Sequence, residues 1–131
     1  MEALIVIFKA LNLFAHNAHN KTKGMTFFQD HDFFGSAYEA YDSAYDSLVE
    51  RCIGLGKNPN LVQIAKSAAG LVEKFSENHS YESLLDLEKQ ICKHIESIME
   101  QHTEGTKNLL AQLADDSEVR QYKIQQRLKG V

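Results

Sequence analysis

The chain has 131 residues, of which 44% are apolar and 24% are charged, a composition typical of one globular domain, residues 1–131, with a buried core. The formal net charge of −4 argues against a protein that coats nucleic acid by bulk electrostatic attraction. One proline and seven glycines leave long stretches without helix breakers, so the composition favours an all-α fold.

The first segment, MEALIVIFKALNLF, is apolar but too short to span a bilayer. It also lacks the basic region and the cleavage site of a signal peptide. Cys52 and Cys92 lie forty residues apart, which fits reduced thiols better than a disulfide or a zinc site. We therefore expect a cytoplasmic protein without a membrane segment.

Apolar residues at helical spacing predict a first helix that places His19 at or near its buried face and ends at Gly24. The apolar stripe consists of Leu4, Phe8, Leu11, Ala15 and Ala18. A second helix is predicted from about Phe28 to Ile53, before the breaker Gly54-Leu55-Gly56. Its predicted core stripe consists of Phe34, Ala37, Tyr38, Tyr41, Tyr45, Leu48 and Cys52.

Residues 54–79 form a long connection around one short helical segment, roughly Leu61–Ala69. Ser80 is the predicted N-cap of a third helix, whose apolar face consists of Leu84, Leu87, Ile91, Ile95 and Ile98. A turn at Thr103-Glu104-Gly105 leads to a last helix, about Thr106–Arg127, with a polar middle. Two helices, a long crossover and two further helices predict a ferritin-like four-helix bundle with a short extra helix in the crossover.

The second helix also carries acidic residues at a spacing of three or four, about a third of a turn from its core stripe. These residues are Glu39, Asp42, Asp46 and Glu50. With His19 and His31 ahead of them, they supply the imidazole and carboxylate ligands that suit iron, manganese or zinc. A solvated helix face with two structural histidines is the alternative interpretation. His16, His79 and His94 are expected to be surface or capping groups.

One segment, AHNKTKGMTFFQDHDFFGSAYEAYDSAYDSLVER, resembles the signature of the Dps proteins, or mini-ferritins. The resemblance lies in His19, Lys23-Gly24, Phe27-Phe28, His31 twelve residues after the first histidine, and Asp46-x-x-x-Glu50-Arg51. It implies a hollow dodecamer built from two-fold dimers. Such a shell oxidises Fe(II) with peroxide or oxygen and stores ferric iron inside.

The resemblance also implies where the iron is oxidised, at the two-fold dimer interface. His19 and His31 would come from one subunit, and Asp46 and Glu50 from its partner. Glu39 and Asp42 are further candidate ligands. Iron is the metal that the resemblance implies, with other divalent metals as alternatives.

The sequence departs from the Dps pattern at two positions and in one segment. Gly35 stands where the family usually has an aspartate four residues after the second histidine, and Asn20 stands where it usually has a tryptophan. No lysine-rich tail precedes the first helix, so we expect no strong DNA binding. A non-catalytic or weakly metal-binding relative of Dps, with its site impaired by Gly35, is therefore one alternative. A monomeric or dimeric helical bundle unrelated to iron is another.

Overall fold

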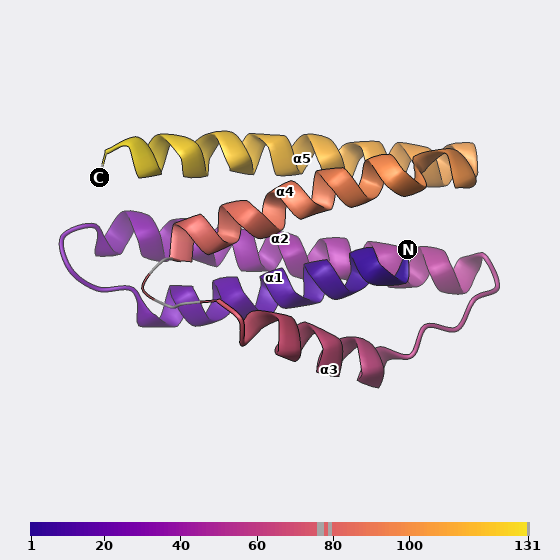
Figure 1. The fold of residues 1–131 in the computed structure, drawn as a ribbon, viewed down its shortest axis with the longest axis horizontal. Coiled ribbons are helices and arrows are strands. Elements are labelled where there is room, and N and C mark those ends of the chain that lie inside the picture. The colour runs from indigo at the N-terminus through magenta and orange to yellow at the C-terminus, as the bar shows by residue number, and fades with distance from the viewer. Residues whose placement is uncertain (76–77, 79, 131) are drawn as a thin grey trace.

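The computed structural model describes residues 1–75, 78 and 80–130, which form helices joined by loops (Figure 1). The elements are α1 (Glu2–Lys21), α2 (Phe27–Gly54), α3 (Leu61–Val72), α4 (Ser80–Ile98), the 3₁₀ turn η2 (Met99–Gln101) and α5 (Glu104–Lys129). The described residues contain no strand. The predicted order of two long helices, a crossover with a short helix and two long helices is confirmed. His79 lies outside the described residues.

The crossover returns the chain along the bundle, because α2 and α4 run in the same direction (Figure 1). α3 makes this return and packs on α1, with Ile64 and Ala68 buried. The side-chain oxygen of Asn60 caps α3 by accepting a hydrogen bond from the backbone N–H of Gln63 at 3.0 Å. α3 continues past the predicted end at Ala69 and reaches Val72.

The hydrophobic core fills the space between the four long helices. The largest fully buried side chains are Tyr41, Phe8, Leu4, Ile5, Leu11, Leu48, Ile64, Leu84, Leu87, Ile91, Ile95 and Leu110. Each buried side chain of this size stabilises the fold by about 1.5 to 3 kcal/mol relative to an exposed one. The apolar stripes predicted for α1 and α4 supply many of these residues, so the periodicity identified the buried faces of both helices.

The predicted core stripe of α2 is confirmed, except that Tyr38 and Tyr45 are only partly buried and pack against the core from its edge. Tyr38 stacks on His16 of α1, with ring centroids 4.1 Å apart, at the edge of the α1–α2 contact. An amphipathic tyrosine can cover such an edge while its hydroxyl stays near water. In their place, the α2 face of the core includes two smaller residues, Ala44 and Val49.

Two helix starts differ from the prediction. α5 begins at Glu104 rather than after a turn, because Thr103 Oγ1 accepts a hydrogen bond from the backbone N–H of Thr106 at 3.3 Å. Ser80 is the first residue of α4 and not its N-cap. α1 ends at Lys21, three residues before the predicted end at Gly24, because Thr22 already has an extended backbone. Gly24 lies in the turn that follows, with a φ of +89° that favours glycine.

None of the helices in the described part of the chain is long and apolar enough to cross a membrane. Cys52 is buried and Cys92 is half-buried. Both are free thiols.

A charged group buried in the bundle explains the polar middle of α5. Glu88 of α4 is fully buried and accepts hydrogen bonds from Tyr41, Ser117 and Arg120. Burial alone would lower the pKa of Arg120, but the adjacent carboxylate of Glu88 outweighs it and raises that pKa. Burial, and then the same carboxylate, raise the pKa of Tyr41 well above its usual value. The hydroxyl of Tyr41 therefore stays protonated and donates a hydrogen bond to the carboxylate of Glu88.

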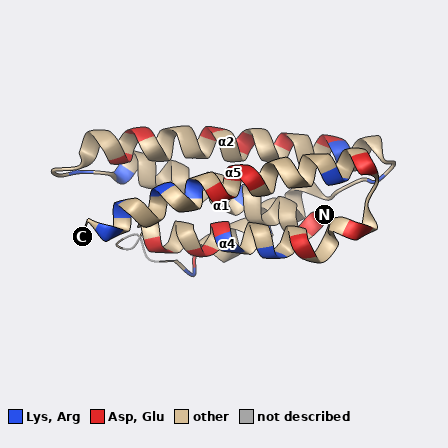
Figure 2. Ribbon diagram, turned by 90° about the horizontal axis from the view of Figure 1, so that it is seen from above, with Lys and Arg blue, Asp and Glu red and all other residues tan. Residues whose placement is uncertain are grey.

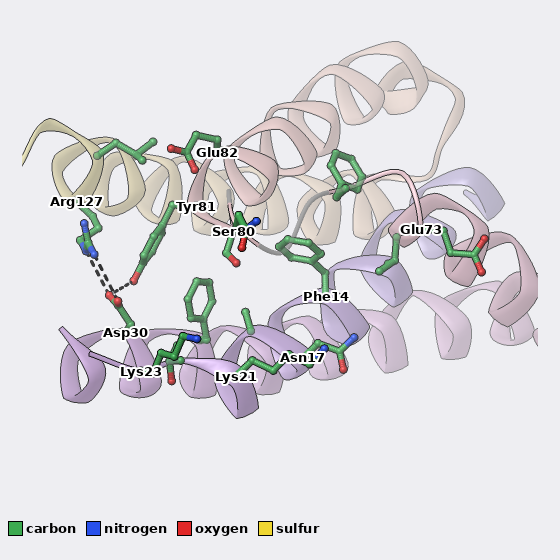
Figure 3. A pocket seen from close by; sticks show the side chains of 17 residues that line it. Phe14, Asn17, Lys21, Lys23, Asp30, Glu73, Ser80, Tyr81, Glu82 and Arg127 are labelled. Carbon is green, nitrogen blue, oxygen red and sulfur yellow. Dashed lines mark hydrogen bonds and ion pairs between the residues drawn. The ribbon is translucent and has the colours of Figure 1, made fainter. Parts of the chain in front are cut away.

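A second polar cluster joins three helix ends beside a cavity of ≈ 630 Å³ (Figure 3). Asp30 in the first turn of α2 accepts hydrogen bonds from Tyr81 of α4 and from Thr26, each at 2.7 Å. Arg127 near the end of α5 donates to the same carboxylate at 3.3 Å. Burial raises the pKa of Asp30, but the bonds from Tyr81, Thr26 and Arg127 together outweigh it and lower the pKa.

The lowered pKa of Asp30 predicts a specific loss of stability in acid. A carboxyl whose pKa falls on folding stabilises the folded state above its unfolded pKa, here near 3.8. This stabilisation is lost as the pH falls through the lower, folded value. Asp30→Asn should melt at a lower temperature near neutral pH, but its melting temperature should fall less than that of the unmodified protein below about pH 4. Equal acid-induced falls in the two proteins would contradict the assignment.

Candidate metal centre

Two of the predicted ligands, His19 and His31, meet across the α1–α2 turn. His19 lies in the last turn of α1 and His31 lies near the start of α2. Their rings are stacked, with centroids 3.7 Å apart and planes inclined by 23°. The Nδ1 of His19 donates to the carbonyl oxygen of His31 at 2.8 Å, and the Nδ1 of His31 donates to that of His19 at 3.0 Å. The two residues are therefore paired reciprocally.

These two hydrogen bonds determine which ring nitrogen carries the proton in each neutral imidazole. A carbonyl oxygen can only accept a hydrogen bond, so Nδ1 must carry the hydrogen in both His19 and His31. Nε2 then has its lone pair available, which is the form in which an imidazole binds a metal ion. A hydrogen bond from the other ring nitrogen to a backbone carbonyl is a common way to orient such a ligand.

Aromatic and small residues surround the histidine pair. Phe27 stacks on His31 with ring centroids 4.9 Å apart. Tyr38 meets His19 edge-on, with centroids 5.3 Å apart. Gly35, one turn after His31, lies against the ring of His19. Both histidines are partly buried, so the stacked and hydrogen-bonded pair still faces solvent in part.

The carboxylates lie elsewhere on the same helix. Asp46 and Glu50 follow His31 by about 22 and 28 Å along the axis of α2. All four predicted carboxylates are exposed: Glu39, Asp42, Asp46 and Glu50. Figure 2 shows acidic residues spread along α2. No three His, Cys, Asp or Glu side chains among the described residues are grouped so that they could hold one metal ion. A single chain thus brings together only the two histidines of the predicted ligand set.

The outer surface of α2 carries large apolar side chains at both ends. Phe28, Gly35, Asp46 and Ile53 are separated by seven or eleven residues, close to two or three turns, so they share one line along the helix, called here the α2 line. Phe28 is 82% exposed and Ile53 is 55% exposed. Met25, in the turn before α2, is also fully exposed. Single exposed apolar side chains are common on protein surfaces, but here they lie at both ends of one line along α2.

Sequence reasoning missed two features of this structure. The sequence pattern indicates only that Gly35 lacks a ligand, whereas in the structure its lack of a side chain also makes room for His19. Glu88 was not identified as a buried charge. A signal for it was present, because Glu88 lies at helical spacing between Leu84 and Ile91 on the apolar face of α4.

Residues 8–130 match the family described as the ferritin-like domain. The match begins within α1 and ends after α5, so it includes both histidines, the α2 line and the crossover. No curated protein matches this sequence.

Proposed function

Since this chain belongs to the family of ferritin-like domains, whose members include ferroxidases, we propose that it is a Dps-like ferroxidase. It would bind Fe(II), oxidise it with peroxide or oxygen, and store the ferric product in a hollow shell. The observation that supports this most is the reciprocal pairing of His19 and His31, which leaves Nε2 of both rings ready to bind a metal ion.

A second copy of the chain would complete the ligand set. When two α2 helices pair antiparallel about a two-fold axis, residues at one end of each helix meet residues at the other end of its partner. Ala40 lies about midway between His31 and Glu50, and also about midway between Phe28 and Ile53. A two-fold axis that crosses the α2 line at the level of Ala40 would therefore cover the exposed apolar ends of this line and bring Asp46 and Glu50 close to the histidines of the partner.

The oxidation of Fe(II) by peroxide at such a site balances in atoms and electrons. Two Fe(II) ions each give one electron to one hydrogen peroxide, whose O–O bond breaks, and two protons convert the oxygens to two waters. Imidazole nitrogen and carboxylate oxygen bind Fe(II) while open positions admit the oxidant. Other divalent metals would compete at the same ligands.

We place this activity in the cytosol, in an assembly of about twelve chains that does not bind DNA strongly because its subunits are acidic.

Ile53→Arg tests the shared site. Ile53 is exposed in the last turn of α2, where the helix dipole favours a cation, so the fold of the single chain should not change. The native mass should fall from about twelve chains to one or two, and peroxide-driven Fe(II) oxidation should be lost with it. Light scattering and ferric absorbance measure the two effects. Val119→Arg, at a half-exposed position of α5, is the matched control and should change neither.

The oxidation rate and the native mass of the unmodified protein distinguish the ferroxidase from the non-catalytic shell. Oxidation no faster than in buffer, from a protein that still assembles, would overturn the ferroxidase and support a non-catalytic shell. Gly35 is the observation that favours this second candidate, because it removes a carboxylate from the histidine half of the site. A native mass of one chain would overturn both.

A further inference from the structure

Gly35 lies where a side chain would collide with the ring of His19. A Cβ at position 35 would be 3.0 Å from Nδ1 and 3.1 Å from Cε1 of His19, closer than ordinary van der Waals contact. At Gly70 in α3, nothing lies within 4 Å of such a Cβ. Glycine inside a helix is otherwise unfavourable. The space that it leaves is therefore a local reason for glycine at this position.

The ring of His19 cannot yield freely to a side chain at position 35. It is stacked on His31 and its Nδ1 donates to the carbonyl oxygen of His31 at 2.8 Å. A shift of a few tenths of an ångström would strain one of these contacts. In this packing, an aspartate at position 35 would add a carboxylate beside the histidine pair and would also push the ring of His19 by a few tenths of an ångström.

We propose that Gly35 determines the metal preference of the site, an inference that rests on the proposed function. Gly35 keeps His19 in place as a nitrogen ligand and keeps a carboxylate out of the histidine half. Among the described residues, no Asp or Glu joins His19 and His31 in a group of three ligands. Zn²⁺ binds a given set of nitrogen and oxygen ligands more tightly than Fe(II), and a carboxylate, which suits harder ions, is missing from this half of the site. Zn²⁺ would therefore occupy this site in preference to Fe(II) and compete with it.

A melting-temperature cycle in metal-free protein tests the packing. Gly70→Ala should raise the melting temperature, because alanine favours a helix and nothing opposes it there. Gly35→Ala should lower the melting temperature or leave it unchanged. In a His19→Ala background, where the ring is absent, Gly35→Ala should instead raise it as Gly70→Ala does. An increase for Gly35→Ala in the unmodified background, equal to that for Gly70→Ala, would overturn the packing argument.

Equilibrium dialysis under anaerobic conditions, with Zn²⁺ or Fe(II) as the only metal, tests the preference. Gly35→Asp should bind Zn²⁺ about 10- to 100-fold more weakly than the unmodified protein, as expected when a ligand loses its orienting contacts. Its affinity for Fe(II) should fall less, because the new carboxylate compensates for part of the loss. His31→Ala is the control that removes the site.

Two results of the dialysis would overturn the proposal. One is unchanged Zn²⁺ affinity in Gly35→Asp, and the other is equal Zn²⁺ affinity in the unmodified protein and His31→Ala. Neither measurement involves oxidation. A protein that binds Zn²⁺ as expected but does not oxidise Fe(II) would therefore refute the proposed ferroxidase and leave the role of Gly35 supported.

Discussion

His31→Ala and Glu50→Ala should each reduce peroxide-driven Fe(II) oxidation by at least about 100-fold, since each removes a direct ligand of the proposed site. Glu50 is exposed in the single chain, and His31 is partly buried near the start of α2. Both variants should therefore retain the helical fold and the native mass of the unmodified protein. Initial rates of ferric absorbance, measured beside native mass, separate the loss of a ligand from the loss of the assembly.

Co-assembly of the two inactive variants should restore activity, because the proposed site is shared by two chains. In a mixed dimer, one site contains both damaged residues and the other contains neither. If the chains pair at random, half of the dimers are mixed, so about a quarter of all sites are intact. Co-expressed His31→Ala and Glu50→Ala should therefore show about a quarter of the original rate.

The matched control combines His31→Ala with His19→Ala. Both changes lie in the same half of the site, so no arrangement of these two chains produces an intact ligand set. This mixture should stay inactive. Activity in the control, or no recovery in the test mixture, would show that the ligands are not divided between chains in the proposed way.

Arg120→Met should greatly lower the free energy of unfolding, because it leaves the fully buried carboxylate of Glu88 without its cation. Removing one partner of a buried ion pair costs about 3 to 5 kcal/mol. For a chain of this size, such a loss lowers the melting temperature by roughly 10 °C or more. Tyr41 and Ser117 still donate hydrogen bonds to Glu88, but neither donor is charged.

A double variant makes this prediction sharper. Glu88→Met together with Arg120→Met removes both charges and fills the space with apolar atoms, so it should be more stable than Arg120→Met alone. Thermal melting of the two variants and the unmodified protein measures this coupling. A melting temperature for Arg120→Met within a few degrees of the original would mean that the ion pair contributes little.

The order of the helices could be predicted because it depends on local periodicity. Leu84, Leu87, Ile91 and Ile95 recur at helical spacing and all are buried in α4. The errors arose where a side chain contacts another helix or caps a turn. Tyr38 is at helical spacing with the core but is covered from the side by His16, and Thr103 caps α5 through one hydrogen bond. The spacing of apolar residues carries no information about contacts between helices or about helix caps.

The candidate site could be predicted only in part. That His19 and His31 would come together was expected from the resemblance, and the structure pairs them. Their reciprocal hydrogen bonds and the contact with Gly35 depend on backbone positions, which no residue pattern specifies. The role of Asp46 and Glu50 as metal ligands stays a prediction, because in one chain they lie far along α2 from the histidines.

The histidine pair is oriented by backbone atoms, and this affects how the site can change in evolution. Every residue supplies a carbonyl oxygen whatever its side chain, so the acceptors for His19 and His31 survive substitution of the residues around them. The orientation of these imidazoles depends on the path of the chain through the turn at Gly24. Neighbouring positions such as Asn20, which is exposed, can therefore accumulate substitutions without disturbing the rings. A site built in this way tolerates drift in sequence as long as the turn keeps its shape and Gly35 leaves room for the ring of His19.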